Sequence, residues 1–78
     1  MQFVIRGTVF NLSMADVEEK LEYVEPEGKS KYLVRVNGKA YPIKQVISQV
    51  TGLPPIGFTS QDAYRILSRL GFRVEQDR

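Results

Sequence analysis

The stretch from Val36 to Leu53 constrains the fold most, because it contains a turn, a helix start and a helix end in close succession. Its Asn37-Gly38 pair is preferred in type I′ turns, in which both central residues have positive φ. Side chains in the residues before it alternate as in a strand, so we expect an antiparallel hairpin formed by residues 32–36 and 39–41. The return strand should be short, because Pro42 has no N–H to donate to a ladder.

Two helices are predicted after this hairpin. Pro42 suits a first helical turn, and apolar residues then recur at helical spacing at positions 43, 46, 47 and 50. Gly52 and the proline pair behind it end this pattern. A second stripe at positions 63, 66, 67 and 70 follows a cap at Thr59 or Ser60 and stops at Gly71.

An acidic amphipathic helix is predicted nearer the N-terminus. Ser13 suits its N-cap, with Asp16 three residues later as in a capping box, and the helix should end near residues 22–23. Extended chain is expected at 3–5, 8–10 and 72–74, with a bulge or tight bend at Gly7. The sequence thus predicts one small domain, residues 1–78, of the α+β class. It should hold a mostly antiparallel sheet with three helices on one face, in the order β-α-β-β-α-α-β.

The residue types present argue against catalysis. The chain has no cysteine and no histidine, which excludes disulfides, thiolate metal sites and the commonest general base. Carboxylates at Asp16, Glu19 and Glu22 should share a solvent face, whereas metal ligands must converge. We therefore expect a protein that is not an enzyme, with no catalytic residue, metal or cofactor.

No feature of the sequence indicates a membrane protein. No apolar run approaches the ~20 residues that span a bilayer. The N-terminus also lacks the basic region and apolar run of a signal peptide. We expect a cytoplasmic protein without a membrane partner.

Charge is distributed unevenly along the chain. Residues 1–28 hold six acids and two bases, whereas residues 29–78 hold nine bases and three acids. Such a division suggests one anionic and one cationic region, the second of which could face a phosphate backbone. The alternative is that both regions are solvated faces that attract each other within the fold.

The candidate site residues follow the Asn37-Gly38 turn. Two helix N-termini, at Pro42 and at Thr59 to Gln61, would offer free backbone N–H groups of the kind that hold phosphate oxygens. Basic side chains near them would contact the backbone, and glutamines on the outer face of the earlier helix could reach a base edge. The full candidate set is Lys39, Tyr41, Pro42, Lys44, Gln45, Gln49, Thr59, Ser60, Gln61, Arg65 and Arg69.

Each of these assignments has a plainer alternative. Thr59 or Ser60 could simply cap a helix. Arg65 and Arg69 could lie on an exposed face, with Asp62 partly pairing Arg65. The ring of Tyr41 could be buried in the strand, or it could form an apolar wall beside the Pro42 ring.

The segment from Tyr32 to Val74 resembles small DNA-reading domains of modification-dependent restriction endonucleases, notably the sulfur-binding domains attached to HNH nucleases. The residues that carry the resemblance are Asn37-Gly38-Lys39, Tyr41-Pro42-x-Lys44-x-Val46, Thr51-Gly52, Phe58-Thr59-Ser60 and Arg65-x-Leu67-x-Arg69-Leu70-Gly71-Phe72. In that family, a Tyr-Pro pair and a small apolar residue three positions after the proline help form a shallow pocket for a phosphorothioate sulfur. The matching pair here is Tyr41-Pro42, and Gln45 stands at the third position, where the family has a small apolar residue. The resemblance implies a related fold and a DNA-facing surface at these positions.

Two functions follow as hypotheses. The first is a non-catalytic DNA-binding module, a modification-reading specificity domain of a defence system, with a nuclease domain or partner protein beside it. The second is a protein-interaction or dimerising regulatory module that binds no nucleic acid. It would use the opposite charges of the two halves to join chains in a homo-oligomer.

Overall fold

The Asn37-Gly38 turn joins two antiparallel strands, β3 (Tyr32–Val36) and β4 (Lys39–Pro42), as the sequence predicts. In the computed structural model, which describes residues 1–28 and 30–76, φ is +53° at Asn37 and +80° at Gly38. A third strand, β5 (Val74–Gln76), pairs antiparallel with the other side of β3 and completes a sheet of order β4-β3-β5. Pro42 is tolerated in β4 because this strand lies at the sheet edge. Three charged residues counted above, Lys29, Asp77 and Arg78, lie outside the described residues.

The N-terminal extended chain forms a second, separate sheet. Strands β1 (Gln2–Ile5) and β2 (Thr8–Asn11) make an antiparallel hairpin, with Phe3 opposite Phe10. The bend expected at Gly7 is a tight turn, with φ of +49° at Arg6 and +79° at Gly7. This hairpin does not join the β4-β3-β5 sheet.

The three predicted helices are present. They are α1 (Met14–Lys20), α2 (Ile43–Thr51) and α3 (Ser60–Leu70), with a short 3-10 turn, η1 (Pro55–Gly57), before α3. Capping boxes open α1 and α3, formed by Ser13 with Asp16 and by Thr59 with Asp62. Helix α1 ends slightly earlier than predicted, and β5 starts later because the Phe72 N–H donates to the Leu67 carbonyl at the end of α3.

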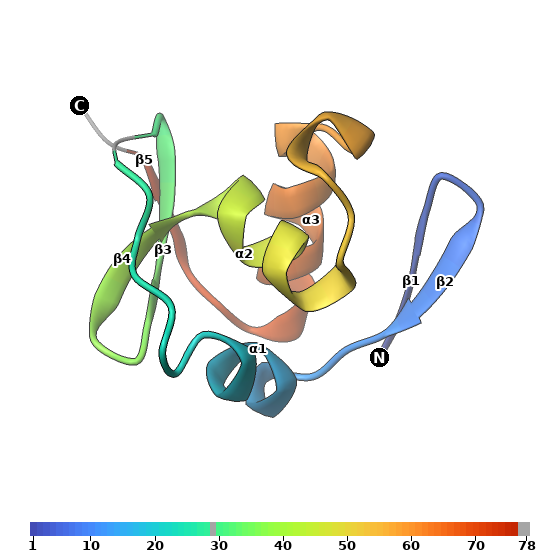
Figure 1. Cartoon of the computed structure of the whole chain (residues 1–78). Helices are drawn as coiled ribbons and strands as arrows, with labels where there is room; N and C mark the ends of the chain where they lie inside the picture. Colours follow the sequence, from blue (N-terminus) through green and yellow to red (C-terminus); the bar gives the residue numbers. More distant parts are fainter. Residues whose placement is uncertain (29, 77–78) are drawn as a thin grey trace.

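The helices lie between the two sheets (Figure 1). They cover one face of β4-β3-β5, as predicted, and the β1–β2 hairpin lies beyond them on the other side. The apolar faces of all three layers meet in one core, whose fully buried members include Leu21, Val34, Tyr41, Ile47 and Ile66. The class and the order of elements are therefore those expected from the sequence, with the first strand folded back into a hairpin.

Candidate functional site

Gln45 is buried, so the prediction that it faces outward is wrong. Only 5% of Gln45 is exposed. Its Oε1 accepts a hydrogen bond from the Glu27 N–H at 2.9 Å, and its Nε2 donates to the Glu25 carbonyl at 2.8 Å. We call residues 22–28 the acidic loop, since they include Glu22, Glu25 and Glu27. These bonds hold the acidic loop over the start of α2, so Gln45 cannot reach a base edge in this conformation.

The start of α2 is closed for the same reason. The ring of Tyr41 is fully buried, and its hydroxyl donates to the carbonyl oxygens of Leu21 and Val24. Of the two alternatives for Tyr41, the buried ring is the one observed. Pro42 and Ile43 are buried as well. This helix end therefore presents no open surface to a phosphate, contrary to the expectation for the terminus at Pro42.

The two candidate lysines have partners within the chain. Lys39 Nζ lies 2.8 Å from Glu25 Oε1 in the acidic loop. That hydrogen bond raises the pKa of Lys39 above its ordinary value. Lys44 is half-buried, with its Nζ 5.5 Å from the centroid of the buried Phe58 ring. Gln49 is the one candidate on α2 that is exposed, as expected.

The N-terminus of α3 already holds an anion. Thr59 Oγ1 accepts from the Asp62 N–H, and Asp62 Oδ2 accepts from the Thr59 N–H, each at 3.1 Å. The hydrogen bond from the Thr59 backbone is the main reason that the pKa of Asp62 lies below its ordinary value. The capping alternative is therefore observed for Thr59, whereas Ser60 is the first residue of the helix.

The remaining candidates lie on the outer side of α3. Positions 63, 66 and 67 face the core, and the opposite side of the helix is exposed. We call this exposed side the α3 face, which consists of Gln61, Tyr64, Arg65, Ser68 and Arg69. Its only acidic neighbour on the helix is Asp62, whose Oδ1 lies 3.4 Å from Arg65 Nη2.

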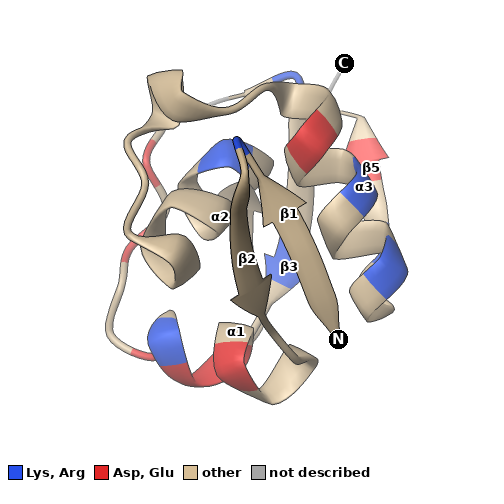
Figure 2. Cartoon of the chain, turned by 90° about the vertical axis from the view of Figure 1, so that its right-hand side faces the viewer, with Lys and Arg blue, Asp and Glu red and all other residues tan. Residues whose placement is uncertain are grey.

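The β1–β2 hairpin borders the α3 face. The guanidinium carbon of Arg69 lies 5.6 Å from the ring centroid of Phe3, a favourable cation–π arrangement. At the hairpin tip, Arg6 is near enough to Asp62 to help lower the pKa of that carboxyl. Figure 2 shows basic bands on α3 and at the hairpin tip on the same side of the molecule. Arg6 was absent from the sequence-based set, because only the folded hairpin brings it to a helix more than fifty residues away.

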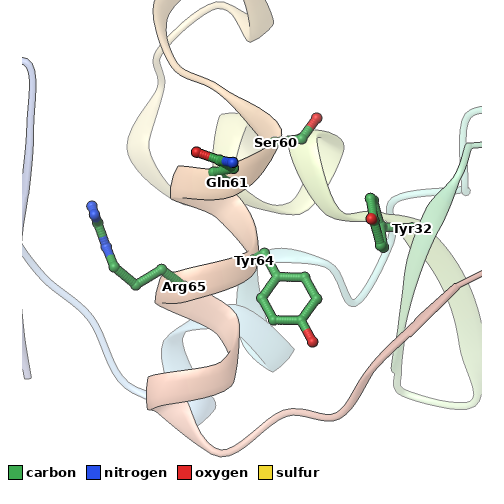
Figure 3. Close-up of a pocket in the computed structure, with 5 residues that line it drawn as sticks. All are labelled: Tyr32, Ser60, Gln61, Tyr64 and Arg65. Atoms are coloured by element: carbon green, nitrogen blue, oxygen red, sulfur yellow. The ribbon is translucent and has the colours of Figure 1, made fainter.

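A small pocket opens where α3 meets β3. It is lined by Tyr32, Ser60, Gln61, Tyr64 and Arg65, has a volume of about 170 Å³, and its walls are mostly apolar (Figure 3). The rings of Tyr32 and Tyr64 meet edge to face, with centroids 5.8 Å apart and planes at 87°. Sequence reasoning missed both tyrosines. The available signal was that Tyr64 lies outside the apolar stripe of its helix.

Neither a metal-binding cluster nor a membrane-spanning helix is present among residues 1–28 and 30–76. No group of three or more acidic, histidine or cysteine side chains is placed to hold a metal ion there. Within the same residues, no helix has the length and apolar character needed to cross a membrane.

A family model described as SCO5918-like matches residues 1–78, the full length of the chain. No curated protein and no solved structure matches.

Proposed function

The chain belongs to the SCO5918-like family, and we propose that it is a non-catalytic DNA-binding module that holds the phosphate backbone against its α3 face. The observation that carries the proposal is the pair Arg65 and Arg69, exposed one helical turn apart. Gln61 and Ser68 lie on the same face and supply neutral hydrogen-bonding groups. Half or more of the hydrogen bonds in protein–DNA interfaces go to phosphate and sugar, from residue types of this kind.

The surroundings of the two arginines support anion binding. Arginine can bind a phosphate through two parallel N–H donors, which a lysine cannot do. Arg69 rests on the Phe3 ring, so less side-chain freedom is lost when it binds a ligand. The weak pair between Arg65 and Asp62 is exposed at the surface and contributes little, so it is easily exchanged for a phosphate.

The proposed DNA contact keeps the candidates on α3 and does not include those at the start of α2. The residues that match the sulfur pocket of the resembling family, Tyr41, Pro42 and Gln45, are buried. Reading of a modification through these residues is therefore left out of the proposal. A place in a defence system, beside a nuclease domain or partner protein, rests on the resemblance alone.

Fluorescence anisotropy titrations with labelled oligonucleotides across a range of salt concentrations test this function. If Arg6, Arg65 and Arg69 each neutralise one phosphate, the logarithm of the affinity should fall with the logarithm of salt concentration with a slope of about −2 to −3. The double variant Arg65→Gln/Arg69→Gln should bind more weakly and lower the magnitude of that slope by about 1.5. The matched control is Arg35→Gln, which removes an exposed arginine from β3.

Two outcomes would contradict the proposal. One is an affinity that does not depend on salt. The other is a double variant that binds as well as the Arg35→Gln control. Circular dichroism of each variant shows whether it is folded. If the loss of Arg69 disturbs the hairpin, the single variant Arg65→Gln replaces the double variant in the titrations.

A second candidate function, a dimerising module, is favoured by the outer face of the hairpin. Val4 and Val9 are cross-strand neighbours on that face and are 58% and 59% exposed. The outer edges of β1 and β2 pair with no other strand in the described part of the chain. A second copy of the chain could add a strand to either edge, or pack its own hairpin against the face that carries both valines. Sedimentation at several concentrations without nucleic acid distinguishes the two candidate functions. A dimer that is lost when Val9 is replaced, formed by a protein that binds no DNA, would favour the dimerising module.

A further inference from the structure

We infer that the pocket between α3 and β3 receives one unpaired nucleobase, so that the module prefers single-stranded DNA to a closed duplex. The inference rests on the proposed function, because the arginines of the α3 face hold the phosphates that accompany this base. It adds a ligand class and a strand preference that phosphate contacts alone do not supply.

The two tyrosines give the pocket its selectivity for planar rings. Tyr32 comes from β3 and Tyr64 from α3, and their nearly perpendicular rings form a corner. A flat ring that stacks on one tyrosine meets the other edge to face, and both arrangements are favourable for aromatic groups. Tyr64 is 45% exposed, so its ring is open to a ligand without unfolding any element.

The size of the pocket restricts the ligand. Pockets for drug-sized molecules enclose about 300–1,000 Å³, whereas this pocket encloses about 170 Å³. It therefore suits a single small ring system that remains attached to a larger molecule outside. A base on a nucleic-acid strand has that form.

The charges around the pocket favour a base over an aromatic peptide side chain. Lys31 Nζ lies 5.7 Å from the Tyr32 ring centroid, and none of the five lining residues is acidic. Figure 3 shows the guanidinium group of Arg65 directed away from the tyrosine pair. A single DNA strand whose base lies against the tyrosines would thus carry its phosphates over helix α3 to Arg65. Proteins that bind single strands combine aromatic stacking and cationic grooves in this way.

Binding of three oligonucleotides to two variants tests the inference. The ligands are a single strand, its duplex, and the same single strand with abasic sites. Tyr64→Leu should weaken binding of the intact single strand about 5- to 150-fold, the range expected for one lost stacking contact, and weaken duplex binding far less. Tyr23→Leu is the matched control, because Tyr23 is 91% exposed and lies in the acidic loop. It should change neither affinity.

The possible results separate this inference from the proposed function. Equal affinity for intact and abasic strands, with salt-dependent binding retained, overturns the base pocket and leaves the phosphate interface standing. An equal loss for single strand and duplex in Tyr64→Leu also overturns the pocket. If no oligonucleotide binds, the proposed function fails, and an NMR titration with adenosine monophosphate decides the pocket alone. Amide shifts clustered around Tyr32 and Tyr64 support the pocket, and unchanged amides there overturn it.

Discussion

Replacing the buried amide of Gln45 tests the packing on which the location of the interface depends. Gln45→Leu keeps nearly the same volume but removes the hydrogen bonds to the Glu27 N–H at 2.9 Å and the Glu25 carbonyl at 2.8 Å. Each hydrogen bond contributes about 0.5–1.5 kcal/mol net, so the free energy of unfolding should fall by about 1–3 kcal/mol. In a domain of this size, 1 kcal/mol changes the Tm by roughly 4–8 °C, so a loss of about 2 kcal/mol should lower it by roughly 8–16 °C.

Urea and thermal unfolding followed by circular dichroism measure this change. Gln49→Leu makes the same substitution one turn later on the exposed side of α2, where a change within about 0.5 kcal/mol is expected. Equal stability of the two variants would refute the reasoning. So would a Gln45→Leu protein of wild-type stability that has lost affinity for DNA, because Gln45 would then face the ligand and not the acidic loop.

Two further predictions concern the buried hydroxyl of Tyr41 and the N-terminal cap of α3. Tyr41→Phe removes the donor to the Leu21 and Val24 carbonyls, so the free energy of unfolding in urea should fall by about 1 kcal/mol with DNA affinity unchanged. For Asp62, hydrogen bonding from Thr59 lowers the folded-state pKa below the ordinary 3.8. The ionised carboxylate of Asp62 therefore makes its whole contribution to folding stability above pH 3.8. This contribution is lost as the pH falls through the lower pKa that Asp62 has in the folded protein. Wild-type Tm should thus fall more steeply below pH 3.8 than that of Asp62→Asn, and parallel curves would contradict this.

Much of the local structure could be predicted from the sequence because particular residues are nearly obligatory there. Asn37-Gly38 accepts two positive φ values in a row, and Ser13 and Thr59 cap helices with an acid three residues later. The first hairpin was less visible, because arginine is not a usual residue for the left-handed position that Arg6 occupies. Its extended chain was recognised, but its separation into a second sheet depends on packing against the helices.

The candidate site was predicted less well because it depends on contacts distant in the sequence. Helical periodicity put Gln45 outside the apolar stripe of α2, and no local pattern shows that a loop eighteen residues earlier covers it. Arg65 and Arg69 were found because one turn of helix separates them whatever the tertiary structure. The Tyr32–Tyr64 pocket lies between a strand and a helix whose relative position no short motif specifies.

The acidic loop also affects how a charged polymer would approach the molecule. In Figure 2 the loop that follows α1 runs along the left of the molecule and helix α3 lies on the right. The acidic bands of α1 and of this loop lie away from the basic bands of α3, and an uneven charge distribution of this kind orients a protein in the field of a polyanion before contact is made. The protein would then meet DNA with its arginines facing the phosphates. Added salt would slow association as well as weaken the final complex.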